Sequence, residues 1–393
     1  MPHLHVKEFK QLSFPISEDE ISFDFLATNH KHPDEKLIAT SYEGKSFFLL
    51  VKENDNKILI KSDKITRPSP NYLIKHALLA YAKASDTEVI SSNVDEGAKN
   101  IHLQNDTALK NINYFVHNFP LDKEIQIEVG FGSGRHLLHQ AEKNPETLFI
   151  GIEIHKASIE QVLKQISIKN LDNLLVLDYD ARLFLELVPS NIVGKIFVHF
   201  PVPWDKKPNR RVISKTFIDE SERVLKQGGR LELRTDSENY YAYSYETFIS
   251  RNQVALEINK NLDIAISSKY EDRWKRMEKN IYDITMTNSK VSEPLKESYN
   301  FLFDTINISQ ESLIDLNGTT LRYKEGFIHF ERLYHIEDGS LLYRVAMGSF
   351  ERPEHLYLLI DTSHLTCKYF PELPVSSPTN QKIHNYLKEL LHG

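Results

Sequence analysis

The middle of the chain alternates short apolar runs with stretches of helical periodicity. Runs typical of buried parallel strands occupy residues 125–129, 148–154, 174–178 and 194–200. Between them, apolar side chains recur at helical spacing, as at 137–141 and 159–166. Strands that alternate with helices predict a doubly wound, Rossmann-like α/β sheet, in which ligands bind at the carboxyl ends of the strands.

The two ends of the chain show the period-two alternation of β-strands instead. Strand candidates in the N-terminal part lie at 21–25, 36–42, 46–52 and 57–62, before a helix at about 71–84. Those in the C-terminal part lie at 318–323, 327–336, 341–349 and 355–361, before an amphipathic helix at about 380–391. We expect β-rich segments over 1–112 and 296–393, on either side of a central domain over 113–295, with a polar linker at 86–112. One hypothesis is that the two β-rich segments pack together into one accessory domain.

Three alternate glycines, Gly130, Gly132 and Gly134, follow the first central strand, and Glu128 stands two residues before them. A dinucleotide site has the spacing G-x-G-x-x-G, whereas this chain has G-x-G-x-G followed by an arginine. The Glu128 carboxylate would repel a pyrophosphate but suits a cationic ligand such as S-adenosyl-L-methionine. The alternative is an ordinary glycine turn of an α/β protein.

Acidic residues also stand at the ends of the second and third central strands. Glu153 ends the second strand, where an acid typically hydrogen-bonds a ribose diol. Asp180, followed by Ala181, comes after the third strand, where a carboxylate can accept the adenine amino group. Because parallel strands end at one edge of the sheet, Glu128, Glu153 and Asp180 together predict a nucleoside pocket.

The fourth central strand leads into a stiff loop, Pro201-Val202-Pro203-Trp204. The two prolines fix φ on either side of Val202, and Trp204 offers a flat face on which a base can stack. The loop continues with the cations Lys206, Lys207, Arg210 and Arg211. Such cations position RNA through its phosphates, or else they belong to a solvated loop that binds nothing.

These motifs resemble those of the TrmB-type tRNA (guanine-N7-)-methyltransferases. The matching stretches are, in chain order, Glu128–Gly134, Phe149–His155, Phe200–Arg211, Leu233–Tyr240 and Ser268–Arg273. The resemblance covers roughly residues 115–290 and implies a class I S-adenosyl-L-methionine-dependent methyltransferase core. The β-rich accessory segments at both ends lie outside it, and their role in tRNA binding, dimerisation or stabilisation stays open.

The resemblance further implies methyl transfer to N7 of a guanosine in the tRNA variable loop, at position 46. The residues that it assigns to the cofactor are Glu128, Gly130, Gly132, Gly134, Glu153, Asp180 and Ala181. Those that it assigns to the substrate are Trp204, Lys206, Arg210, Arg211, Asp236, Ser268, Lys269 and Glu271. In the reaction, Pro203 would hold the loop that aligns the base, and Asp236 would read the guanine edge.

One position departs from the family pattern, because Val202 stands where the family has an aspartate at the reaction centre. Guanine N7 carries an in-plane lone pair and no proton, so alignment without a general base would suffice, and alignment can contribute about 7–11 kcal/mol. Alternatively, Asp205 or Asp236 supplies the missing acceptor. We favour the first explanation, with Asp236 as the main reader of the base, and loss of activity is a third hypothesis.

Composition constrains the partners and the compartment. A net charge of −7 is unusual for a protein that binds phosphates, so RNA binding must rely on local clusters at 206–211 and 269–279. The chain has one cysteine, Cys367, and lacks zinc-site spacing, a signal-peptide pattern and a membrane-spanning run. We therefore expect a cytoplasmic protein without a metal, and the resemblance implies tRNA as its partner.

Two other functions stay open on the sequence alone. A methyltransferase that acts on a small molecule or a protein would be active without RNA, but this function leaves the basic loop unexplained. A non-catalytic RNA-binding protein would bind RNA without transferring a methyl group, and Val202 would then mark the lost chemistry.

Overall fold

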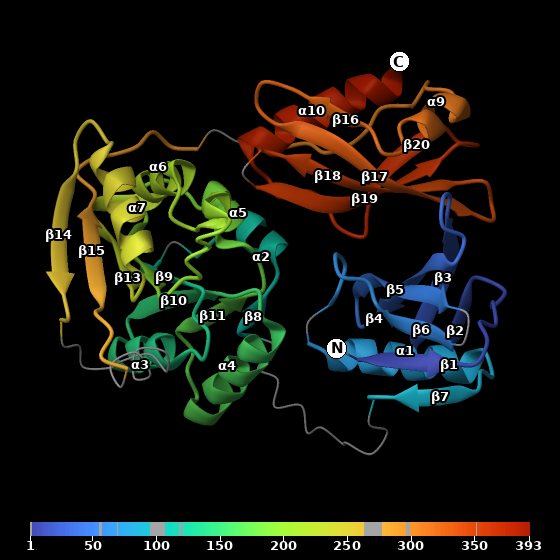
Figure 1. Ribbon diagram of the computed structural model, residues 1–393, viewed down its shortest axis with the longest axis horizontal. Helices are drawn as coiled ribbons and strands as arrows, with labels where there is room; N and C mark the ends of the chain where they lie inside the picture. The colour runs from blue at the N-terminus through green and yellow to red at the C-terminus, as the bar shows by residue number, and fades with distance from the viewer. Residues whose placement is uncertain are drawn as a thin grey trace. The chain divides into compact units, whose positions relative to one another are not determined.

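The computed structural model describes residues 2–54, 57–68, 70–94, 107–117, 119–120, 122–262, 277–295, 299–350 and 352–393 (Figure 1). The chain divides into two compact units. The central unit comprises residues 101–298 and 375–377, and the terminal unit comprises residues 1–100, 299–374 and 378–393.

The central unit is built on an 8-stranded sheet with the order β14-β15-β13-β12-β9-β10-β11-β8. Its strands are β8 (Leu109–Lys110), β9 (Glu124–Val129), β10 (Thr147–Ile152), β11 (Leu174–Leu177), β12 (Val193–His199), β13 (Leu225–Thr235), β14 (Ala255–Lys260) and β15 (Tyr282–Thr287). Strands β8 to β13 pair in parallel, whereas β15 pairs antiparallel with both β13 and β14. The doubly wound, Rossmann-like core expected from the sequence is confirmed.

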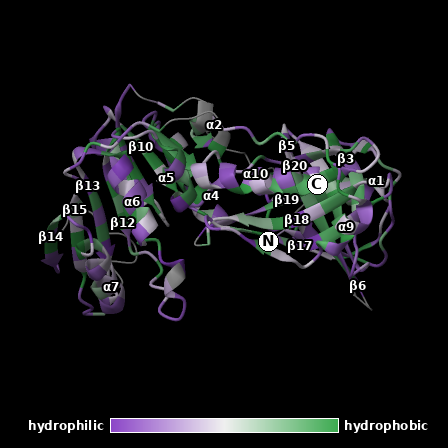
Figure 2. Ribbon diagram, turned by 90° about the horizontal axis from the view of Figure 1, so that it is seen from above, coloured by the Kyte–Doolittle hydropathy of each residue, from purple (hydrophilic) through white to green (hydrophobic). Residues whose placement is uncertain are grey.

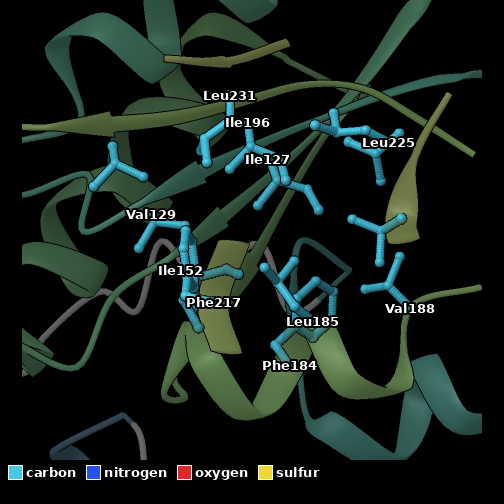
Figure 3. Close-up of a cluster of buried hydrophobic side chains, with 14 of the residues drawn as sticks. Ile127, Val129, Ile152, Phe184, Leu185, Val188, Ile196, Phe217, Leu225 and Leu231 are labelled. Atoms are coloured by element: carbon cyan, nitrogen blue, oxygen red, sulfur yellow. The ribbon is translucent and has the colours of Figure 1, made fainter. Parts of the chain in front are cut away.

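Helices cover both faces of this sheet, because alternate strand residues point to opposite sides. The helices are α2 (Ile112–His117), α3 (Arg135–Lys143), α4 (Lys156–Lys169), α5 (Ala181–Leu187), α6 (Lys215–Val224) and α7 (Glu238–Ile249). One face packs α5 and α6 through a core that includes Ile127, Phe184 and Phe217 (Figure 3). The opposite face packs α3 and α4 through a core that includes Leu137 and Phe149.

The terminal unit is built on a 12-stranded antiparallel sheet, which takes strands from both ends of the chain. From the N-terminal end come β1 (His3–Val6), β2 (Ile16–Glu18), β3 (Ile21–Asn29), β4 (Glu35–Tyr42), β5 (Lys45–Asn54), β6 (Lys57–Ser62) and β7 (Val89–Ser92). From the C-terminal end come β16 (Thr320–Arg322), β17 (Phe327–Ile336), β18 (Leu341–Gly348), β19 (Pro353–Asp361) and β20 (Thr366–Phe370). The two sets join where β3 pairs with β17.

Each set of strands packs against helices from its own end of the chain. Helix α1 (Tyr72–Ala84) shares a core with the N-terminal strands, while α9 (Gln310–Asp315) and α10 (Pro378–His392) share one with the C-terminal strands. A further core brings Ala27 and Phe48 together with Tyr334 and Tyr357. In Figure 2 the strand β18 carries much green, which matches its mostly buried, apolar sequence.

Several elements differ from the expectations. The linker expected at 86–112 contains β7, which pairs with β1, and β8, which pairs with β11 although it precedes residue 113. Strands β14 and β20 and helix α9 were not expected either. All four residues of β7 are exposed, so this edge strand lacks the buried alternation from which strands are predicted. The run 262–266, which is strand-like in sequence, lies largely outside the described residues.

A buried carboxylate ties the two ends of the chain together at the junction of β3, β4 and β17. Glu35 accepts a hydrogen bond from the Tyr334 hydroxyl at 2.7 Å and pairs with the Arg332 guanidinium. Its other oxygen lies 3.1 Å from the Lys52 ammonium. Burial alone would raise the pKa of Glu35, but these donors lower it to about 2.

We predict that Glu35→Ala destabilises the intact protein by roughly 2 kcal/mol, because it leaves the buried Tyr334 hydroxyl without its acceptor and Arg332 without its counter-ion. Urea unfolding of the full chain measures this loss. The control is Glu88→Ala, which removes an exposed ion pair with Lys7 at 3.3 Å and should cost much less. Equal losses in the two variants would show that Glu35 does not hold the junction.

Candidate functional site

The glycine turn between β9 and α3 exposes its backbone at one point and packs tightly at another. Gly130 and Gly134 have φ angles of +70° and +71°, which other residues rarely adopt. A Cβ on Gly134 would lie 2.2 Å from the Val162 Cγ2 atom, so this glycine lets α3 approach α4. A Cβ on Gly130 would meet no atom of the described residues within 4 Å. The turn therefore leaves room for a ligand at Gly130.

Glu153, just beyond the end of β10, is held by the backbone of the same turn. Its Oε2 atom accepts from the Gly132 amide at 2.9 Å, and its Oε1 atom accepts from the amides of Ile154 and His155 at 2.8 and 3.0 Å. Three amides fix the carboxylate, and Oε2 keeps a lone pair for a further donor. This is the arrangement expected of a ribose acceptor.

Glu128 differs from the expectation that it faces a cationic ligand. The residue is only 3% exposed, and its Oε2 atom lies 2.7 Å from Nδ1 of His136 on α3. The partner of the Glu128 carboxylate is therefore a side chain of the protein itself. Burial lowers the pKa of His136, but the Glu128 carboxylate, helped by Glu232, more than offsets this effect, and the pKa lies above its usual value.

Partly buried polar side chains continue across the same face of the sheet from His136. The ring of His136 lies 4.6 Å from that of His199, centroid to centroid. His199 Nε2 lies 2.7 Å from Glu232 Oε1, and the Lys195 ammonium lies 2.7 Å from Glu232 Oε2. Burial would raise the pKa of Glu232, but His199 and Lys195 hold it well below its usual range. This row of polar side chains connects the glycine turn to the last residue of β12.

Asp180 caps the start of α5. Its Oδ1 atom accepts from the Arg182 amide at 2.9 Å, and the Arg182 guanidinium bonds both oxygens, at 3.0 and 2.6 Å. Ala181, the first residue of α5, is buried. An adenine amino group would therefore share the Asp180 carboxylate with Arg182.

The loop after β12 carries its apolar residues on the outside. Val202 is 61% exposed and Trp204 is 37% exposed. Phe200 and Trp204 have φ angles of +51° and +47°, and the Phe200 amide donates to the Arg234 carbonyl at 2.7 Å. The Arg210 guanidinium lies 5.2 Å from the centre of the Trp204 ring. Lys206 and Lys207 are exposed, as expected of phosphate contacts.

Comparison with known proteins places these features in a family. A family model described as "Putative methyltransferase" matches residues 122–284. A protein of Wolinella succinogenes is 42% identical over 100% of both chains, and its name is tRNA (guanine-N(7)-)-methyltransferase. The chain belongs to this methyltransferase family. Proteins with the same name from Campylobacter jejuni and Helicobacter pylori are 40% and 38% identical over 100% of this chain and 98% of theirs.

Arg211 and Asp236, two of the residues expected to bind the substrate, are bonded to other side chains or to the backbone of the chain. Arg211 is 6% exposed and bonds inside its own loop, and its expected contact with phosphate stays a prediction. The Asp236 carboxylate lies 2.9 Å from the Lys279 ammonium, in a pair that solvent reaches on both sides. Ser268, Lys269 and Glu271 lie outside the described residues.

Sequence reasoning missed the partners more often than the site residues. His136 and Arg182 were not assigned a role, and Lys279 was expected only as part of the basic cluster at 269–279, although each contacts an expected site carboxylate. Spacing could have indicated Arg182, two residues after the helix cap, but a contact such as that of Lys279 with Asp236 depends on tertiary folding. Two absences apply to the described ranges alone: they contain no cluster of three or more metal-binding side chains, and none of their helices is long and apolar enough to cross a membrane.

We predict that His136 makes the stability of the central unit depend on pH. Because its pKa is raised in the folded state, its contribution is fully present below the usual value and is lost as the pH rises through the folded pKa. His136→Gln should therefore flatten the fall in unfolding temperature between mildly acidic and alkaline pH, as measured by calorimetry. His139→Gln, on the same helix, controls for substitution in α3, and an unchanged pH dependence in His136→Gln would contradict the prediction.

Proposed function

We propose that the protein transfers a methyl group from S-adenosyl-L-methionine to N7 of a guanosine in tRNA, at position 46 of the variable loop. The observation that carries the proposal is the 42% identity over the whole of both chains with a protein named tRNA (guanine-N(7)-)-methyltransferase. The pairing of β9 with β12 adds support, because it sets the glycine turn and the Pro201–Arg211 loop at neighbouring strand ends.

The residues around the glycine turn fit S-adenosyl-L-methionine. The open side of Gly130 admits a ligand against the backbone, and Glu153 Oε2 presents a lone pair to a ribose hydroxyl. Asp180 is placed to share its carboxylate with the adenine amino group. When bound, S-adenosyl-L-methionine supplies an electrophilic methyl group on a sulfonium. Glu128, paired with His136, would act on the positive ligand through its field and not by direct contact.

The Pro201–Arg211 loop would align the guanine and does not need to remove a proton. Guanine N7 already has a free lone pair in the plane of the ring, so the step requires in-line placement above all. Trp204 would offer its face to a base, and the exposed Val202 and the half-buried Pro203 come directly before it in the loop. Asp236 would release Lys279 and accept hydrogen bonds from the guanine edge instead. The freed Lys279 ammonium would then pair with a phosphate.

The exposed cations of the loop would supply the RNA affinity. Lys206, Lys207 and Arg210 are all exposed, within a chain whose net charge is −7. Local phosphate contacts of this kind release counter-ions, so tRNA affinity should fall steeply as salt rises. The cytoplasm, where tRNA is found, is the proposed compartment.

The decisive measurement is transfer of radiolabelled methyl groups from S-adenosyl-L-methionine to unmodified tRNA. We expect label that digestion identifies as N7-methylguanine, with none on a tRNA whose variable-loop guanine is replaced by adenine. Label on other nucleotides or without RNA would favour a different methyltransferase. Binding of both ligands without label would favour an inactive RNA-binding protein.

We predict that Val202→Asp changes the single-turnover rate less than about 3-fold, because alignment and not a carboxylate limits attack by N7. The matched control is Val202→Asn, which has the same shape without the charge. A rate increase of more than about 10-fold in the aspartate variant alone would show that the carboxylate matters and that the chain compensates poorly for its loss.

A further inference from the structure

We propose that Arg211 is a positioning residue of the methyl-transfer reaction, which locks the Pro201–Arg211 loop to α7 and makes no contact with RNA phosphate. The inference rests on the proposed function and deepens it. It divides the basic stretch after Trp204 into exposed cations that bind RNA and one buried cation that shapes the loop.

The burial of Arg211 sets it apart from its neighbours in the sequence. Lys206, Lys207 and Arg210 are exposed, whereas Arg211 is almost fully buried. Its Nη2 atom lies 3.2 Å from Asp205 Oδ1, so its charge already has a counter-ion within the loop. A phosphate would have to displace Asp205 and reach a guanidinium that solvent hardly touches.

Arg211 contacts the loop on both sides of Trp204. Its Nε atom donates to the Pro203 carbonyl at 2.7 Å, next to Val202, where the base is expected. The Nε and Nη2 donors thus hold Pro203 and Asp205, which flank Trp204. The planar fork fixes both at once, which a lysine ammonium could not do with the same geometry.

The guanidinium also lies against two tyrosines of α7. It is 5.3 Å from the ring centre of Tyr240 and 4.5 Å from that of Tyr243, within the range of cation–π attraction. The Tyr240 hydroxyl accepts from the Ile213 amide at 3.0 Å, which fastens the chain just beyond Arg211 to the same helix.

The contact of Arg211 with Tyr240 and Tyr243, here called the platform, lies close in the chain to Asp236, the other expected substrate residue. The Tyr240 amide donates to Ser237 Oγ at 3.2 Å, in the cap that starts α7, and Asp236 immediately precedes that cap. Arg211 therefore sets the position of the base-stacking loop relative to the residue expected to read the guanine edge. A shift of about 1 Å between groups that align a reaction can reduce its rate about 100-fold.

The test compares Arg211→Lys and Arg211→Ala with Arg210→Ala in the full-length protein. For each variant, single-turnover methyl transfer, tRNA binding and the slope of log Kd against log salt are measured. Mobility of Trp204 is followed without RNA by fluorescence anisotropy, after replacement of Trp274, the second tryptophan of the sequence, by phenylalanine.

We expect both Arg211 variants to lose about 100-fold in single-turnover rate, with tRNA Kd within about 2-fold, an unchanged salt slope and a lower Trp204 anisotropy. Arg210→Ala should instead reduce the magnitude of the salt slope by about 0.7–0.9, the value for one phosphate contact. Tyr243→Ala, which removes only part of the platform, should reproduce the Arg211 pattern and decides the matter if the Arg211 variants do not fold.

The proposal is overturned by one combined result. In it, Arg211→Ala reduces the magnitude of the salt slope, Arg211→Lys restores that magnitude, and the Trp204 anisotropy is the same in all variants. Unchanged transfer rates in every Arg211 and Tyr243 variant would overturn it as well. If the parent protein transfers no methyl group, the proposed function fails by itself, and the salt slopes with the anisotropy still decide whether Arg211 braces the loop or binds phosphate.

Discussion

The pairing of β3 with β17 is the constraint on which the architecture depends. It joins strands from the two ends of the chain, and the Tyr334 hydroxyl bonds Glu35, 299 positions earlier in the sequence. The central unit is thus an insertion in the terminal unit, which cannot complete its sheet until both ends of the chain are present. Because the entropy of loop closure grows only slowly with length, about 0.6 kcal/mol per doubling, a folded insertion of this size is tolerated.

Within the central unit, exposure separates the charges that organise the site from those that can bind. Glu128 with His136 and Arg211 with Asp205 each place at least one charge deep in the protein, where removal of a partner is costly. Asp236 with Lys279 lies in reach of solvent, where the pair contributes little and exchanges readily. On the proposed function, a substrate would replace the partner in the second kind of pair and leave the first kind intact. Residues of the same charge in one stretch of sequence therefore have different roles, according to whether they are buried or exposed.

The sequence was sufficient to predict the strands of the core but not which charged side chains contact one another. The strands β9 to β12 were predictable because they are apolar runs that alternate with helices, and the glycine turn and Glu153 follow from their place at strand ends. Strand β7 was not, because an exposed edge strand shows no buried face. Arg211 looked like its exposed neighbours, since only the folded position of Tyr240 and Tyr243 distinguishes it from them. Which charges are paired is a property of tertiary structure.

On the proposed function, restraint of the loop after β12 would make an aspartate at position 202 unnecessary. Phe200 and Trp204 adopt left-handed backbone angles, which cost roughly 1–3 kcal/mol each in residues other than glycine and persist only when their surroundings hold them. Those surroundings are present: the Arg234 carbonyl holds the Phe200 amide, and Arg211 holds the Pro203 carbonyl. The restraint thus comes from backbone contacts and a buried cation, none of which involves the side chain at 202. A nucleophile that has no proton to lose needs this restraint more than it needs a base, so the valine is compatible with the chemistry.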